Sequence, residues 1–334
     1  MTPTSETECQ PERIQGLHQL TIAVLSVSFA VGVVANGLVL WMMVFRMPCA
    51  VTTIWFSHLA FADFMALLPL PITIYSLVTG QWPLTAAACK LYITFLAISF
   101  FTSIWFLVLI SLDRCISVVY PFWSRNHRTM QRAVWLAGCV WLLALVTCSP
   151  NLIFQDVEKQ KGCEYCSFKF TTRARNDSKA EEERVAVTLI HILLGFLVPL
   201  AIIGTCAYLI RTRLRQEGCA HARRRKRLLL MLVSAFFAFW FPFNTVLVAR
   251  LWQARDKLRP ILWATFSLGC FNSCLNPFLY VFIGRDFQEK FFQSLPSVLA
   301  RAFGEEGFFN QPVPKVKPPG DDGNLQIQAG SPPA

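Results

Sequence analysis

Charged residues are scarce in this sequence. They make up 15% of its 334 residues, whereas about 25% is usual for a soluble domain. Hydrophobic residues make up 54%, and the aromatic content is high, with 29 Phe and 10 Trp. Lys and Arg outnumber Asp and Glu by 31 to 20, which would suggest a nucleic-acid partner if the excess covered a soluble surface. The basic residues gather beside apolar segments instead, so we expect no nucleic-acid partner.

The sequence also lacks the motifs of common enzyme sites. It has no P-loop, no zinc-binding helix motif and no nucleophile elbow, so we expect neither catalysis nor an organic cofactor. The first 17 residues are polar without a basic start, which argues against a secretory signal peptide. The 12 cysteines lie mostly singly within apolar segments, where they are typical of small buried side chains.

Seven apolar runs, each close to or above the roughly 20 residues that a helix needs to cross a bilayer, divide the chain. They lack the alternation of a membrane barrel and are too long for strands of a soluble domain. The runs are Ile14–Phe45, Met47–Cys89, Leu91–Leu112, Ala133–Gln155, Val185–Ile210, Leu228–Ala249 and Pro260–Gly284. The predicted fold class is an all-α membrane protein, a seven-transmembrane helix bundle occupying residues 18–284.

The distribution of Lys and Arg predicts the orientation. The loop after the fifth run is strongly basic, and the loop after the third carries Arg125, Arg128 and Arg132. The segment 1–17 has Glu6, Glu8 and Glu12 against one Arg. The positive-inside rule then places the amino terminus outside the plasma membrane and the carboxyl terminus inside. The basic loops either contact anionic lipids or serve only as a topology signal.

Two segments lie beside the bundle in this prediction. The extracellular loop 156–183 contains the glycosylation acceptor Asn176. After the seventh run, Phe287, Phe291 and Leu295 recur at helical spacing, which predicts an amphipathic helix on the inner membrane surface over 285–299. Pro, Gly and Asp dominate thereafter, so residues 300–334 are expected to be a disordered tail.

Two acidic residues and two cysteines attract attention by their positions. Asp63 lies inside a run, where a carboxylate needs polar partners, a bound cation or a proton. Asp113 stands beside Arg114 at the end of the third run and is the expected partner of that guanidinium. Cys163 and Cys166 have the spacing of half a zinc site, but a second pair of ligands is missing, so disulfides are favoured.

The order of several motifs resembles the rhodopsin-like (class A) G-protein-coupled receptors. Each motif is short, but together they extend from about Leu20 to Leu299 and fall in the family's order. They are Asn36 in the first run, Asp63 in the second, Asp113-Arg114-Cys115 ending the third, Trp141 in the fourth, Pro199 in the fifth, Trp240-Phe241-Pro242 in the sixth and Asn276-Pro277-Phe278-Leu279-Tyr280 in the seventh.

The resemblance implies roles for these residues. It implies G-protein coupling through Asp113, Arg114, Pro121, Phe122 and Tyr280. It implies an activation switch at Ile104, Pro199, Phe236, Trp240, Pro242, Asn276 and Pro277. It implies an allosteric sodium site at Asp63, Ser103, Asn272, Ser273 and Asn276, with Asn36 nearby; the alternative is a protonated Asp63 in a hydrogen-bond network. It also implies a disulfide from Cys89 to the extracellular loop 156–183. Within that loop Cys166 is favoured over Cys163 as the partner, which leaves Cys163 to pair with Cys9.

Departures from the family pattern bear on signalling strength. The tyrosine expected eight residues after Pro199 is replaced by Ala207, and Tyr208 follows one residue later, rotated by about 100°. Ala222 stands where many relatives carry an acid, and Cys115 replaces a tyrosine. A weakly signalling or scavenger receptor is therefore an alternative. The seventh run has no lysine for a retinal Schiff base, and the absence of repeats argues against a transporter.

The ligand class is suggested by a closer resemblance. The stretch Tyr120–Thr129 is similar to the chemoattractant group, especially formyl-peptide receptors, and Leu200–Ala207 and Gly284–Leu295 are most similar to receptors for D-series resolvins, lipid mediators that resolve inflammation. This implies Gi-type coupling and an acidic lipid ligand, with a chemoattractant peptide as the alternative. Ala97 removes an acid that formyl-peptide receptors carry. The expected ligand-binding residues are His191, Arg250, Arg259 and Trp240, with the arginines as a cationic rim or, alternatively, a solvated loop.

The carboxyl-terminal segment has few phosphate acceptors. After Arg285 its only hydroxyl residues are Ser294, Ser297 and Ser331. Arrestin recruitment that depends on phosphorylation needs several acceptors, because each phosphate adds about −1.5 to −2 charge. We therefore expect weak recruitment of arrestin through this segment.

Overall fold

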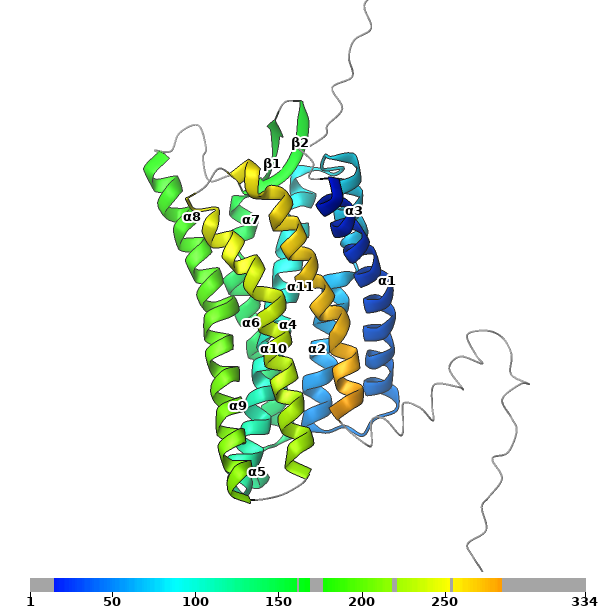
Figure 1. The fold of residues 1–334 in the computed structure, drawn as a ribbon, viewed down its shortest axis with the longest axis vertical. Helices are drawn as coiled ribbons and strands as arrows, with labels where there is room; N and C mark the ends of the chain where they lie inside the picture. Colours follow the sequence, from blue (N-terminus) through cyan, green and yellow to red (C-terminus); the bar gives the residue numbers. More distant parts are fainter. Residues whose placement is uncertain (1–14, 161, 169–176, 218–220, 253–254, 284–334) are drawn as a thin grey trace, which may run out of the picture. The chain divides into compact units, whose positions relative to one another are not determined.

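The computed structural model describes residues 15–160, 162–168, 177–217, 221–252 and 255–283 (Figure 1). The predictions for Cys9, Asn176, the amphipathic helix 285–299 and the tail 300–334 lie outside these residues. The side chains of residues 221–233 in α10 and of residues 255–257 and 279–283 in α11 are also outside the description, including those of Ala222 and Tyr280.

Helices make up almost all of the described chain. The elements are α1 (Gln15–Phe45), α2 (Val51–Leu67), α3 (Leu70–Thr79), α4 (Ala86–Val119), α5 (Pro121–His127), α6 (Met130–Cys148), α7 (Pro150–Phe154), β1 (Gln155–Gln160), β2 (Cys163–Phe168), α8 (Asp177–Ile192), a π-helical turn (Leu193–Leu197), α9 (Val198–Glu217), α10 (His221–Ala249) and α11 (Arg255–Ile283). The first helix begins at Gln15, three residues before the predicted domain boundary.

Membrane-crossing length is reached in five continuous stretches of the described residues. These are Gly16–Phe45, Val51–Thr79, Ala86–Val119, Met130–Phe154 and Glu182–Arg213. The last two predicted runs lie in α10 and α11, each 29 residues long, and the apolar part of α10 spans Ser234–Ala249. Six of the predicted runs thus lie mainly in one helix or in helices that follow one another directly, whereas the second, Met47–Cys89, covers α2 and α3, crosses the non-helical residues 80–85 and reaches the start of α4.

Prolines explain the interruptions. Pro69 separates α2 from α3, and Pro150 starts α7, because a proline lacks the N–H that a continuing helix needs. The π-helical turn lies directly before Pro199 and adds a residue to one turn, which re-aims the side chains above it. Pro242 and Pro277 lie inside their helices.

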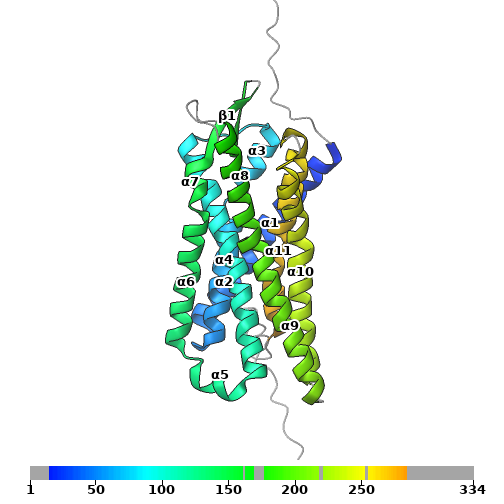
Figure 2. The same cartoon turned by 90° about the vertical axis from the view of Figure 1, so that its left-hand side faces the viewer.

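Helix α4 is the centre of the bundle. In its most apolar stretch 67% of the residues are buried, against 28% in α1 and in Met130–Phe154. It packs against α2, α6 and α9, while α11 packs against α1 and α10 (Figure 1). Figure 2 shows α4 flanked by α6 on one side and by α9 on the other. The predicted all-α bundle is confirmed.

The predicted extracellular loop contains a β-hairpin. Its strands β1 and β2 pair antiparallel, with Val157 opposite Cys166 and Glu158 opposite Tyr165, and Gly162 has a positive φ of 86° in the turn. The backbone N–H of Trp82 donates to the Glu164 carbonyl at 2.7 Å. The sequence predicted only a loop here. The hairpin lies at one end of the bundle (Figure 1).

Candidate ion, ligand and coupling sites

Asp63 is fully buried in α2 and is hydrogen-bonded from two other helices. The Ser103 hydroxyl of α4 donates to its Oδ1 at 2.7 Å, and the Asn276 amide of α11 donates to its Oδ2 at 2.7 Å. Both donors are uncharged. The structure therefore brings three of the predicted ion-site residues, Asp63, Ser103 and Asn276, into direct contact.

The other residues of the predicted ion site are also buried. Asn272 and Ser273 of α11 are buried, and the Asn36 amide donates to the Ser273 carbonyl at 3.2 Å. The Asn36 Oδ1 is buried and accepts no hydrogen bond from any described residue. An oxygen of this kind suits a hard cation or its water shell, so the donor set fits a sodium ion.

The predicted switch residues form a buried column. Ile104, Phe236 and Trp240 are each no more than 5% exposed, and Phe196 stacks on Phe236 with ring centroids 5.8 Å apart. Pro199 is buried and Pro242 half-buried; Asn276 and Pro277 lie buried one helix away. The ring of Trp240 meets Phe100 edge-on at 5.2 Å, and a Cβ added at Gly269 would lie 3.2 Å from that ring. Glycine at 269 is thus needed for the present position of the indole.

An aromatic layer lies next to the column. Phe266 contacts Phe100, Phe243 and Trp263, and Phe243 contacts Trp240 at 6.0 Å. His191, predicted as a ligand residue, is half-buried and meets Phe243 edge-on at 6.4 Å. It therefore belongs to the wall formed by α8 and α10.

Cationic side chains mark the outer end of α11 and α10. The Arg259 guanidinium lies over the Tyr165 ring, 4.2 Å from its centroid, in a cation–π contact. Arg250 follows the last residue of α10, and nearby Arg184 donates to the Leu251 carbonyl at 3.1 Å. Sequence reasoning missed Tyr165, because nothing in the sequence predicts which residue of the hairpin reaches α11.

The predicted disulfide between Cys89 and Cys166 is confirmed, with the two Cα atoms 5.6 Å apart. It joins the outer end of α4 to β2. Cys163 is buried and also disulfide-bonded. Its predicted partner, Cys9, lies outside the described residues, so that pairing stays a prediction.

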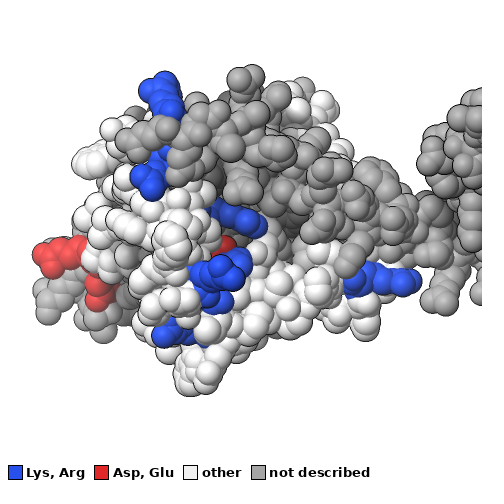
Figure 3. Space-filling view, turned by 90° about the horizontal axis from the view of Figure 1, so that it is seen from below, with Lys and Arg blue, Asp and Glu red and all other residues white. Residues whose placement is uncertain are grey.

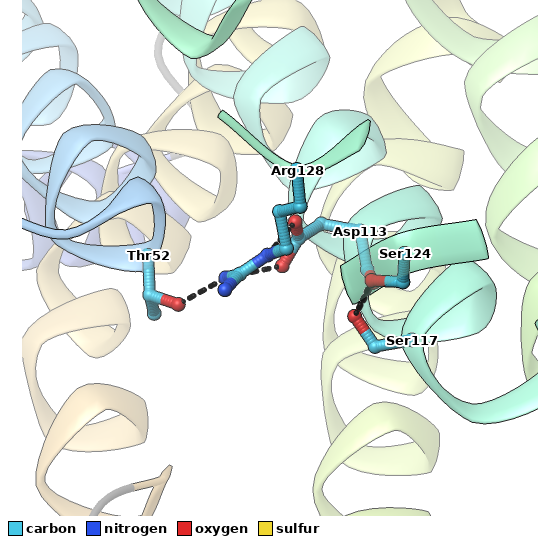
Figure 4. Close-up of polar contacts among 5 residues, drawn as sticks. All are labelled: Thr52, Asp113, Ser117, Ser124 and Arg128. Carbon is cyan, nitrogen blue, oxygen red and sulfur yellow. Dashed lines mark hydrogen bonds and ion pairs between the residues drawn. The ribbon is translucent and has the colours of Figure 1, made fainter. Parts of the chain in front are cut away.

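The carboxyl-terminal end of α4 carries an ion pair that was not predicted from the sequence. Arg128 donates to both oxygens of Asp113, from Nε at 2.7 Å and from Nη2 at 3.0 Å, and Nη2 also donates to the Thr52 hydroxyl at 2.6 Å (Figure 4). The expected partner of this carboxylate was Arg114. The structure gives it a bidentate partner from the loop after α5 and thereby links α4 to the start of α2.

The remaining predicted coupling residues lie in α5 and α11. Pro121 and Phe122 begin α5, and the Phe122 side chain is 87% exposed. Ser117 of α4 contacts Ser124 of α5 at 3.3 Å (Figure 4). Tyr280 lies in α11. Lys and Arg side chains are distributed over this face of the molecule, which Figure 3 shows from below.

The departures predicted from sequence have structural counterparts in α9. Tyr208 is 66% exposed on the outside of the bundle, while Ala207 is half-buried. Cys115 and Cys206 are hydrogen-bonded to each other and form a buried cluster with Ile210. The one-residue shift of the tyrosine thus turns its side chain away from the helix interface.

Comparison with known proteins agrees with this geometry. Residues 35–280 match the model of the 7 transmembrane receptor (rhodopsin family). The chain is 55% identical to the probable G-protein coupled receptor 32 of Homo sapiens over 316 residues, which cover 90% of this chain and 88% of the relative. It is 39% identical to the N-formyl peptide receptor 2 of Macaca mulatta, over 91% of this chain and 92% of the relative, and 39% identical to the human N-formyl peptide receptor 2, over 87% of each.

A receptor of this kind takes an extracellular ligand and a G protein as partners, crosses the plasma membrane several times and is not an enzyme. The chain belongs to the rhodopsin family of seven-transmembrane G-protein-coupled receptors, within its chemoattractant and formyl-peptide-like group.

Proposed function

We propose that this receptor binds an acidic lipid mediator of the resolvin type and couples to a Gi-type G protein. The observation that carries the proposal is the stack of Arg259 on Tyr165 at the outer end of the bundle, beside the aromatic layer. A fatty acid needs an apolar chamber for its chain and a cation for its carboxylate. Phe243, Phe266 and Trp263 supply aromatic surface for the chain.

The Tyr165 ring holds the Arg259 guanidinium in place and leaves its N–H groups able to donate. The ring covers one face of the guanidinium, while the N–H groups point outward from the edge of the plane and can reach a carboxylate in bidentate fashion. Tyr165 is itself well fixed, because its neighbours Glu164 and Cys166 are held by Trp82 and by the disulfide. Since side chains alternate along a strand, Tyr165 projects from the face of β2 opposite to the disulfide.

The inner end supports coupling. Arg114 supplies the charge that meets the G protein, and Phe122, 87% exposed, offers an apolar contact beside it. The arginines around α5 favour an amino terminus outside and a basic inner face that also contacts membrane lipids. In the inner part of the bundle, Asp63, Ser103, Asn272, Ser273 and Asn276 would hold a sodium ion, which would neutralise the buried carboxylate. Arrestin recruitment is expected to be weak.

The test compares a D-series resolvin with its methyl ester, because esterification removes the negative charge and adds only one methyl group. In cells expressing the receptor, the acid should inhibit cyclic-AMP formation and the ester should be at least about tenfold weaker, corresponding to ~1.4 kcal/mol. Replacing Arg259 with Leu should weaken the acid to the level of the ester. Lys159→Ala is the matched control, because Lys159 is a hairpin cation that is already paired with Glu164 at 2.9 Å.

Arg114→Ala separates signalling from binding, since it should abolish the response while the probe still binds. Equal potency of acid and ester in the wild type would contradict the proposal for an acidic ligand. Binding without any response in the wild type would contradict Gi coupling and favour a scavenger receptor, which the outward position of Tyr208 makes worth testing.

A peptide is the second candidate ligand, because two of the relatives are named as formyl-peptide receptors. A formyl-methionyl peptide therefore belongs in the same assay. A response to this peptide that survives Arg259→Leu, with none to the lipid acid, would favour the peptide.

A further inference from the structure

Two free thiols from different helices meet in the half of the bundle that contains Arg114. Cys115 of α4 and Cys206 of α9 are hydrogen-bonded to each other, and the two residues are 6% and 3% exposed. Together with Ile210 they form a buried cluster, and further apolar side chains of the same two helices pack around it. The two sulfurs are thus held next to each other by the packing of α4 on α9.

The other free cysteines of the described residues are placed differently. Cys148 of α6 is buried in a separate cluster that contains no second cysteine. Cys270 and Cys274 are both buried but lie one turn apart on α11, so a bond between them would not join two elements. Cys49 and Cys139 are exposed. A new bond at the first pair, in contrast, would connect two helices.

A metal site is the first use to consider for two neighbouring thiols. A structural zinc ion takes four protein ligands from cysteine, histidine or a carboxylate. Within the described part of the chain, no group of three or more such residues comes together, and the neighbours of Cys115 and Cys206 are apolar. These surroundings favour a reaction of the two thiols with each other over the binding of a metal ion.

Hydrogen peroxide is an oxidant that converts such a pair into a disulfide in two steps. In the first step, one cysteine sulfur attacks a peroxide oxygen, the O–O bond breaks, and a sulfenic acid and water are formed. In the second step, the other sulfur attacks the sulfenic sulfur, the S–O bond breaks, and the S–S bond forms as a second water leaves. The two thiols together lose two electrons and two protons, and the peroxide is reduced to two waters.

Burial affects both the formation and the removal of this bond. Buried cysteines react slowly, and the predicted cytoplasmic side keeps thiols reduced, so the pair is reduced at rest. Hydrogen peroxide is small and uncharged and can enter the bundle. Glutathione is a charged tripeptide, and a disulfide between two buried sulfurs is shielded from it. A link that forms under oxidising conditions should therefore persist longer than an exposed disulfide.

We propose that Cys115 and Cys206 are a site of reversible oxidation, at which a peroxide joins α4 to α9 through a disulfide. Cys115 directly follows Arg114, so the bond fixes the segment of α4 that carries this arginine against α9. The receptor then has a reduced form, in which the two helices can shift against each other, and an oxidised form, in which they cannot. The inference does not depend on the identity of the ligand.

Peptide mapping tests the formation of the bond directly. Membranes that contain the full-length receptor are treated with hydrogen peroxide, the remaining thiols are blocked with iodoacetamide, and the protein is digested without reduction. The wild type should yield a linked pair of peptides that contains Cys115 and Cys206, absent without peroxide and lost on reduction with dithiothreitol. The Cys89–Cys166 disulfide is the internal reference, because it should be found with and without peroxide.

Thermal unfolding in detergent tests whether the bond joins the two helices. A disulfide that closes a long loop restricts the unfolded chain, so peroxide should raise the Tm of the wild type by about 5 °C. Cys206→Ala removes one of the two sulfurs and should abolish this rise. Cys148→Ala is the matched control, because it removes a buried cysteine from the separate cluster on α6. It should keep the full rise.

Three results would overturn the inference. Recovery of Cys115 and Cys206 as blocked thiols after peroxide would show that the pair does not react. Recovery of either residue as an unlinked sulfinic acid would show that the second sulfur does not reach the first. A rise in Tm that persists in Cys206→Ala would assign the effect to oxidation elsewhere. Mapping of the wild type decides the question even if the variant fails to fold.

Discussion

Asp63 and Asp113 are two carboxylates of the same bundle in opposite surroundings. Asp63 is fully buried, and the uncharged side chains of Ser103 and Asn276 donate hydrogen bonds to it. The Asp113 side chain is 10% exposed and is held at both oxygens by Arg128. The hydrogen-bond partners of the first carboxylate are thus uncharged, whereas the partner of the second is a permanent cation. The difference shows that residues of the chain neutralise Asp113, whereas a bound cation or a proton would have to neutralise Asp63.

The largest expected effect comes from removing the permanent cation. Arg128→Ala leaves the mostly buried Asp113 carboxylate without its bidentate partner, which we expect to lower the free energy of unfolding by about 2 kcal/mol. It also separates α4 from the loop and from Thr52, so basal signalling should rise. Thermal unfolding in detergent and ligand-free cyclic-AMP inhibition measure the two effects.

Arg132→Ala is the control for this variant. Arg132 is an exposed arginine four residues away that donates to the His127 carbonyl at 3.1 Å, so its loss removes the same charge without freeing a carboxylate. Equal effects of the two variants would show that net charge, and not the Asp113 pair, matters at this end.

Agonist affinity should depend on the sodium concentration through the buried carboxylate of Asp63. If sodium binds beside Asp63 in the resting state, it should lower agonist affinity about tenfold, or ~1.4 kcal/mol, relative to the same concentration of choline chloride. Asp63→Asn keeps the size of the side chain and removes the charge that holds the ion, so the sodium effect should disappear. Ser111→Ala, another buried hydroxyl on α4, should leave it intact. A sodium effect that persists in Asp63→Asn would place the ion elsewhere.

The contrast between the two sites also separates what the sequence could predict from what it could not. Asp63, Ser103 and Asn276 were predicted together, because each lies in a motif whose place on its helix is set by the family pattern, and helices of fixed rise bring those places to one level. The Cys89–Cys166 disulfide was also predicted, because the family resemblance implied a crosslink from α4 to the loop that contains Cys166.

Two other contacts made by loops were not predicted. Arg128 was interpreted only as a topology signal. Its guanidinium reaches Asp113 because the short helix α5 and the turn after it reverse the chain, and the sequence did not predict that reversal. Tyr165 was not considered, because its contact with Arg259 depends on the register of a hairpin that the disulfide positions. In both cases the sequence shows the cation, Arg128 or Arg259, but not the path of the loop that brings the cation and its partner together.

The smallest expected effect tests whether Thr52, Asp113 and Arg128 act as one hydrogen-bond network. Thr52→Val removes the hydroxyl that accepts from Arg128 Nη2 and keeps the shape of the side chain, so it should cost about 0.5–1 kcal/mol of stability. If Thr52 acts only through Arg128, the double variant with Arg128→Ala should be no less stable than Arg128→Ala alone. A thermal-unfolding double-mutant cycle measures this coupling. Additive losses would instead assign Thr52 to the local packing of α2, and the link between α2 and α4 would then depend on Asp113 and Arg128 without it.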